Sequence, residues 1–125
     1  MNRHKLREKC MTCLYQHRLL KKEINEACID VFGGDVQQLN GFEKNLLQNV
    51  IDHEEEYIDY INQVLNDWTF DRLGYVEQSI LLLACSEFEQ KETEAAIIID
   101  EAINLAKAFC EDDSYKLING VLDRL

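Results

Sequence analysis

Residues 76–89 read VEQSILLLACSEFE. The six residues at the centre of this stretch, 80–85, are all apolar, so a helix here presents apolar side chains on nearly every face. A helix of that kind is stable in water only when other elements surround it. We therefore predict that residues 76–89 form a buried central helix against which the rest of the chain packs.

The remainder of the chain also carries a helical pattern. Proline is absent, glycine occurs five times, and apolar residues recur mostly at three- and four-residue steps, which is the spacing of one helix face. We expect further helices over about residues 3–21, 23–32, 40–65, 95–110 and 114–125, and a short turn over about 69–73. The sequence therefore predicts an all-α fold.

The longest predicted helix contains an interruption. Asn40 is a good N-cap residue, and an apolar stripe runs from Phe42 to Val50 and again from Tyr57 to Trp68. The charged residues 53–56 separate the two parts of this stripe, so we expect a kink or two consecutive helices there.

The last two predicted helices close the C-terminal half. We expect Phe109 and Leu125 to be the last inward-facing residues of the helices over about 95–110 and 114–125. Asp112, Asp113 and Ser114 lie where capping groups and negative charge favour the start of the final helix.

Charge is distributed unevenly along the chain. The net charge is −11, but residues 1–22 hold seven basic residues against one acid, Glu8, a net charge of +6. The other 103 residues hold six basic and 23 acidic residues, a net charge of −17. Screening acts over about 8 Å at physiological salt, so the basic end can attract a polyanion while the acidic body attracts a basic partner.

Length and cysteine content favour one soluble domain, residues 1–125, in a reducing compartment. A chain of 125 residues can bury roughly two-thirds of its unfolded surface without covalent cross-links. Five cysteines are an odd number, unlike the even sets of small secreted folds. Residues 1–22 lack the apolar core of a signal peptide, and the longest apolar run is far below the roughly 20 residues of a membrane span. We expect a cytoplasmic protein without membrane contact.

The cysteines and the first two arginines of the first predicted helix have different expected surroundings. Cys10 and Cys13 lie on the inward face, in the middle of the helix and without a second ligand pair nearby, so we interpret them as small core residues. A metal or redox pair is the alternative. Arg3 and Arg7, one turn apart, share an outer face.

A cluster of acids around His53 resembles a set of metal ligands. It comprises residues 53–56 and Asp59, but it lacks the Glu-x-x-His and His-Glu-x-x-His spacings of helical metal sites. A solvated helix face explains it better. We also find no phosphate-binding glycine loop and no nucleophile elbow, and we predict a binding protein that is not an enzyme and carries no cofactor or metal.

The basic N-terminus is the strongest functional signal. Its simplest interpretation is a solvated helix face, and nucleic-acid binding is the alternative. Tyr15 adds either a stacking surface for an unstacked base or an interior tyrosine with a bonded hydroxyl.

Three stretches together resemble the NusB family of bacterial transcription antitermination factors. The first runs from Arg3-His4-Lys5-Leu6-Arg7-Glu8 to Cys13-Leu14-Tyr15-Gln16. The second is Trp68-x3-Arg72-Leu73-x2-Val76-Glu77-x2-Ile80-Leu81, continuing to Glu87. The third comprises Ile99-Asp100-Glu101-Ala102-Ile103-x-Leu105-Ala106-Lys107 and residues 113–123, DSYKLINGVLD. The resemblance spans nearly the whole chain.

This resemblance implies a fold and a function. The fold would be about seven helices in two packed sub-bundles. The function would be binding of boxA RNA together with the ribosomal protein NusE, within the RNA polymerase antitermination complex that reads through ribosomal RNA operons. The implied RNA contacts are Arg3, His4, Lys5, Arg7, Tyr15, Asp113 and Lys116. Glu77 would border the partner.

Departures from the family pattern leave alternatives open. His4 and Lys5 stand where relatives often carry arginine, so two bidentate phosphate grips are lost, and we expect weaker RNA binding without the partner. The same domain type precedes rRNA cytosine methyltransferases, which leaves an enzyme connection as a rival. A helical adaptor that binds no nucleic acid is a second rival, and the sequence leaves homodimer formation open.

Overall fold

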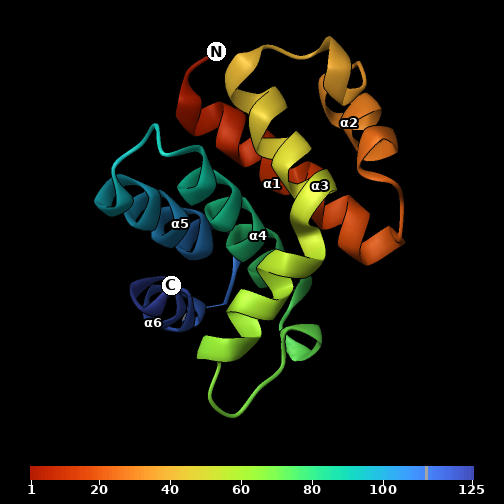
Figure 1. The fold of residues 1–125 in the computed structure, drawn as a ribbon. Coiled ribbons are helices and arrows are strands. Elements are labelled where there is room, and N and C mark those ends of the chain that lie inside the picture. Colours follow the sequence, from red (N-terminus) through yellow and green to blue (C-terminus); the bar gives the residue numbers. More distant parts are fainter. Residues whose placement is uncertain (112) are drawn as a thin grey trace.

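The computed structural model describes residues 1–111 and 113–125, and these form six α-helices and two short 3-10 helices (Figure 1). In chain order they are α1 (Arg3–Leu20), α2 (Ile24–Phe32), η1 (Val36–Gln38), α3 (Gly41–Val64), η2 (Phe70–Arg72), α4 (Tyr75–Gln90), α5 (Ala95–Phe109) and α6 (Ser114–Arg124). The all-α prediction is confirmed. The count is six because the kinked third segment stays one helix.

Helix α4 lies at the centre of the molecule. It packs against α1, α3, α5 and α6, and every residue from Gln78 to Glu87 is buried, as the apolar run predicts. Figure 1 shows α1, α2 and α3 on one side of α4, and α5 with α6 on the other. The two helical sets thus share α4 as their common wall.

Helix α1 is fixed at both ends by local chemistry. The Asn2 side chain accepts a hydrogen bond from the Lys5 backbone N–H and caps the first turn. The helix ends where Lys21 adopts the left-handed conformation with φ 57°. Cys10 and Cys13 are fully buried, and burial raises the pKa of both thiols. Their interpretation as small core residues is confirmed.

Helix α3 bends at its centre, as predicted. His53 has a non-helical backbone, φ −133° and ψ 18°, and Figure 1 shows the change of direction at this level. The half before the kink buries Leu46 and Val50, and the half after it buries Tyr57. The Ser86 hydroxyl of α4 donates to the Leu46 carbonyl at 2.7 Å and ties the first half to the central helix.

The predicted ends of three apolar faces are wrong. Trp68 is 55% exposed because α3 ends at Val64 and the indole lies in the following turn. Phe109 and Leu125 are 45% and 43% exposed, at the last turn of α5 and just beyond α6. Burial fails at Phe109 and Leu125 because they lie at the ends of their helices, and at Trp68 because it follows the end of α3.

The predicted caps have the expected positions but not the expected bonds. Asn40 and Asp113 are the N-cap residues of α3 and α6, yet neither side chain makes a capping hydrogen bond. Asp112 lies outside the described residues.

Candidate functional site

Arg7 lies in the interior and not on the outer face that its spacing from Arg3 suggested. It is 5% exposed, and its Nε and Nη2 donate to the two carboxylate oxygens of Glu87 at 2.8 and 2.6 Å. Glu101 lies 3.9 Å from its Nη1. The hydrogen bond and charge of Glu87, with the charge of Glu101, raise the pKa of Arg7 above its ordinary value against the cost of burial. A direct phosphate contact by Arg7 does not fit this placement in the free chain.

The other three residues of the basic opening stay at the surface. The Arg3 guanidinium lies over the Phe42 ring, 4.4 Å from its centroid. His4 Nδ1 and Glu101 Oε2 are 3.1 Å apart. Lys5 is loosely paired with Glu8 at 3.7 Å, and 63% of its side chain is exposed. The first turn of α1 therefore presents an open cationic edge, narrower than the sequence suggested.

The basic C-terminal end of α1 is largely neutralised by neighbouring acids. Lys22 pairs with Asp30 at 2.6 Å, and Arg18 pairs with Glu54 at 3.1 Å. Lys9 lies over the Phe32 ring, 5.4 Å from its centroid. Arg18 and Lys22 are thus paired, whereas Lys21 stays exposed at the end of α1. The accessible positive charge of residues 1–22 therefore lies at the start of the helix and at Lys21.

Glu54 is the exception to the predicted solvated face, since Glu55, Glu56 and Asp59 are exposed as expected. The Glu54 carboxylate accepts hydrogen bonds from the Arg18 Nη1 and shares a 2.9 Å contact with His17 Nε2. Burial opposes protonation of His17, but the hydrogen bonds to Glu54 and to the Lys22 carbonyl outweigh it and raise its pKa. Burial likewise opposes ionisation of Glu54, and the same partners lower its pKa. This network ties α1 to α3 at the kink.

A second surface lies where α1, the start of α4 and the α5–α6 junction meet. It is an open groove of about 480 Å³, and Tyr15 and Glu77 both line it. Glu77 also accepts a hydrogen bond from the Gly74 N–H at 2.9 Å, which fixes its carboxylate at the first turn of α4. The other lining residues are Gly74, Tyr75, Val76, Phe109, Cys110, Glu111 and Ser114.

Asp113 lies at the margin of this groove, and Lys116 is its ion-pair neighbour. Asp113 lines an adjoining hollow with Glu77. It pairs weakly with Lys116, one turn on, at 3.5 Å, and both side chains are mostly exposed. The structure thus brings Tyr15, Glu77 and Asp113 together. It separates them from the cationic edge by about 18 Å along α1, since Tyr15 lies twelve residue steps of about 1.5 Å after Arg3.

Four residues that organise these surfaces were not identified from the sequence. Glu87 and Glu101 hold Arg7, while Phe42 and Phe32 support Arg3 and Lys9. For Glu87 a signal existed, because a carboxylate in a helix that is buried all round requires a cationic partner. No comparable signal marks the two phenylalanines, which have the spacing of ordinary core residues.

The fold and these two surfaces define a small all-helical interaction domain with separate cationic and acidic contact regions. Within the described residues, no helix combines the length and the apolar character required to cross a membrane. Comparison with known families gives a match to the model of the NusB family over residues 4–125. The chain belongs to the NusB family.

Two curated relatives match along nearly their whole length. The transcription antitermination protein NusB of an Exiguobacterium species is 36% identical, and the match covers all of this chain and 97% of that protein. The NusB of Geobacillus kaustophilus is 32% identical, with 100% and 95% covered.

Solved structures agree with this assignment. Thermotoga maritima NusB superposes with a TM-score of 0.86 at 25% identity, covering 99% of this chain and 89% of that chain. A structure of antitermination factors NusB and NusE in complex with double-stranded RNA gives a TM-score of 0.83 at 26% identity, covering 99% and 96%.

Proposed function

We propose that this chain is a transcription antitermination factor that binds boxA-type RNA together with ribosomal protein NusE in the cytoplasm. In this role it enters the RNA polymerase complex that reads through ribosomal RNA operons. The observation that carries the proposal is the separation, on one family fold, of an open cationic edge at the start of α1 from the groove that Glu77 and Tyr15 line. One surface suits a polyanion and the other suits a basic protein.

The cationic edge supplies two of the RNA contacts, and Lys116, beside the groove, supplies a third. Arg3 and Lys5 are exposed at the first turn of α1, and Lys116 is exposed on α6. His4 adds a cation beside them only in its protonated form. Three phosphate contacts give a log–log salt slope of about −2 for a single strand. This term is not sequence-specific, so base contacts and the partner must supply the preference for boxA.

Arg7 has a different role in this proposal. Its guanidinium is buried and bound by Glu87 on both oxygens, so it holds α1 against α4 and keeps the cationic edge in place. The effect of Arg7 on RNA binding is therefore indirect.

The groove supplies the partner surface. Glu77 and Glu111 give it an acidic rim, and Tyr15 with the exposed Phe109 gives it aromatic surface. Charge complementarity of this kind increases encounter rates with a basic protein and disfavours acidic ones. Asp113, at its edge, borders the RNA side of the same interface.

The test is RNA binding measured with and without NusE, on boxA RNA and on a scrambled RNA of equal length. We expect binding to boxA with NusE to be tighter than each of the other three combinations. A chain that acts only as a helical adaptor would show the same negligible, salt-independent signal for both RNAs. Methyl transfer to ribosomal RNA from S-adenosylmethionine would instead support the enzyme rival.

A further inference from the structure

Arg3 differs from the basic residues that follow it as far as Arg7. His4, Lys5 and Arg7 each lie within 4 Å of a carboxylate. Arg3 has no carboxylate at ion-pair distance among residues 1–111 and 113–125, and its neighbour is an aromatic ring instead. Its full charge therefore remains available to a ligand.

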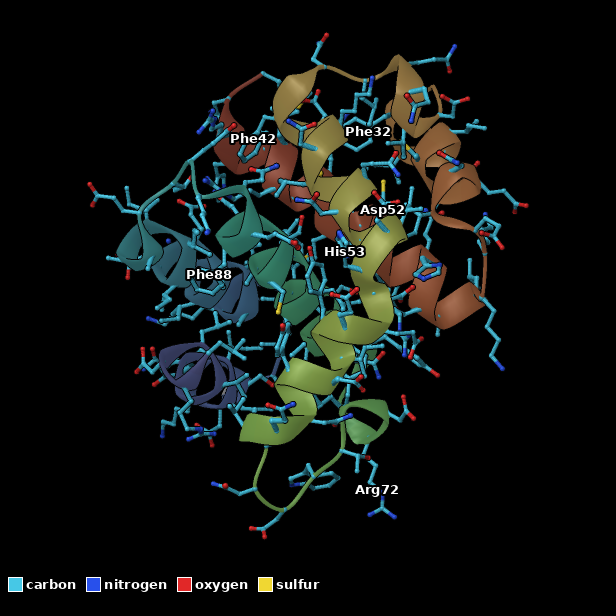
Figure 2. The ribbon with its side chains drawn as sticks, viewed as in Figure 1. Phe32, Phe42, Asp52, His53, Arg72 and Phe88 are labelled. Carbon is cyan, nitrogen blue, oxygen red and sulfur yellow. The ribbon has the colours of Figure 1, made fainter. Side chains whose placement is uncertain are left out.

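That ring belongs to Phe42, in the first turn of α3. Figure 2 shows Phe42 beside the N-terminal half of α1. Contacts with the interior fix the position of the ring, because it packs against the core and because the Arg7 guanidinium lies 5.3 Å from the ring centroid. Arg7 is itself held by both oxygens of Glu87. The ring is thus a rigid support for Arg3.

Stacking on a ring leaves an arginine able to bind phosphate. All five N–H donors of guanidinium lie in its plane, so a ring against its face does not occupy them. An unrestrained arginine loses rotamer freedom when it grips a phosphate, whereas a stacked arginine has lost part of that freedom beforehand. Such pre-organisation increases affinity.

We propose that Phe42 is a positioning residue for RNA binding, which holds the Arg3 guanidinium over its ring at the open end of α1 so that the N–H donors face a phosphate. The proposal rests on the proposed function, since it requires that Arg3 contacts RNA. Phe42 itself touches no phosphate in this role. Its contribution passes entirely through Arg3.

The experiment is a double-mutant cycle of Arg3→Ala and Phe42→Leu, with boxA RNA affinity measured in the presence of NusE across a salt series. A cation–π contact at an exposed site corresponds to an affinity change of about two- to fivefold. We expect Phe42→Leu to weaken binding by about that factor without changing the salt slope, because every phosphate contact is retained. Arg3→Ala should weaken binding and reduce the slope by about 0.7.

The cycle separates positioning from a general packing defect. In the Arg3→Ala background, Phe42→Leu should cause no further loss, and Phe42→Tyr, which keeps the ring, should bind like wild type. Phe88→Leu is the matched control: it makes the same change at a partly buried ring on α4, which Figure 2 shows away from the start of α1. It should leave RNA affinity unchanged.

Each alternative outcome has a definite meaning. Equal losses from Phe42→Leu in the wild-type and Arg3→Ala backgrounds would overturn the positioning role, as would wild-type affinity for Phe42→Leu. If Arg3→Ala leaves both the RNA affinity and the salt slope unchanged, Arg3 does not contact RNA and the positioning role of Phe42 is overturned. Specific boxA binding by the same variant with NusE would show that the proposed function still holds.

A second readout does not depend on a folded Phe42 variant. Ring currents should shift the Arg3 δ protons upfield in the proton NMR spectrum relative to those of Arg72, whose side chain points away from the body in Figure 2. The shift should persist when boxA RNA and NusE are bound. Loss of the upfield shift in the complex would show that Arg3 leaves the ring to bind, and would overturn the proposal.

Discussion

Arg7 and Arg3 show how one helical turn separates a structural cation from an exposed one. They are four residues apart and occupy the same side of α1. Arg7 is overlaid by α3, α4 and α5 through Phe42, Glu87 and Glu101, whereas Arg3 is exposed and contacts α3 through the Phe42 ring. Periodicity identifies a side of a helix, but it does not tell where along that side the neighbouring helices end.

Removing the Arg7 guanidinium should destabilise the fold more than it perturbs any surface. We expect Arg7→Ala to lower the free energy of unfolding by about 3–5 kcal/mol, because Glu87 would remain buried with an uncompensated charge. Urea denaturation followed by circular dichroism measures this. The double variant Arg7→Met/Glu87→Leu replaces both charges with apolar side chains and should recover most of the loss. A loss below about 1 kcal/mol for Arg7→Ala, as at an exposed pair, would contradict the buried ion pair.

The His17–Glu54 pair should make stability depend on pH. Because the pKa of His17 is raised in the folded state, His17 adds to the free energy of unfolding. This contribution is complete below the ordinary histidine pKa of 6.5 and is lost as pH rises through the folded pKa. The lowered pKa of Glu54 gives a second contribution to the free energy of unfolding. It is present above the ordinary glutamate pKa of 4.5 and is lost as pH falls through the folded pKa. The pair is therefore most stabilising between these two pH values.

A comparison with His17→Gln isolates this effect, since glutamine keeps a hydrogen-bonding side chain without titrating. The free energies of unfolding of the two proteins should differ more at about pH 5.5 than at about pH 8.5. A difference that is the same at both pH values would exclude His17 as the source of the pH dependence.

At the scale of elements, the interiors of the helices could be predicted and their ends could not. The run at residues 80–85 identifies α4 because the rest of the chain has a helical pattern, and a helix that is apolar on nearly every face must be surrounded by other elements. The kink at His53 follows from charged residues that break an apolar stripe. The same reasoning wrongly predicts that Phe109 and Trp68 are buried. An apolar residue near a helix end continues the apolar pattern whether or not another element covers it.

The central position of α4 predicts a steep cost for shortening its side chains. We expect Leu82→Ala to lower the free energy of unfolding by about 2–5 kcal/mol, because Leu82 is fully buried and the cavity cannot collapse among four neighbouring helices. The matched control is Leu20→Ala at the exposed end of α1, which should change stability by about 0.5 kcal/mol or less. Both values come from thermal or urea unfolding. Similar losses for the two variants would mean that α4 is not the core of the fold.

At the scale of the whole molecule, the sequence reveals the separation of charge but not how much of it is accessible. The acids that neutralise Arg7, His17 and Arg18 come from α3, α4 and α5, far from α1 in the sequence. A net charge counts these residues without showing that they are paired. Only the folded chain distinguishes these cations from Arg3, which lies over a ring, and from Lys5, which stays exposed beside Glu8. Only there do Tyr15, Glu77 and Asp113 meet.

The acidic rim of the groove leads to a prediction about the partner. Glu77→Lys should weaken NusE binding by about tenfold or more, since a like charge would face a basic protein. Glu77→Lys also loses the hydrogen bond that the Gly74 N–H donates. Glu77→Gln is therefore the second variant, because its amide oxygen can accept the same bond although the charge is gone. Asp59→Lys, an exposed position on α3 outside the groove, makes the same change in net charge and should have little effect.

Association kinetics decide whether Glu77 acts as a rim charge. A charge at the rim of an interface acts mainly on the association rate, so Glu77→Gln should slow association with NusE, and the difference from wild type should fade as salt shortens the screening length. Equal slowing by Asp59→Lys and Glu77→Lys would assign the effect to net charge and not to this groove. If Glu77→Gln weakens NusE affinity only through faster dissociation, and the effect persists at high salt, Glu77 lies inside a desolvated contact.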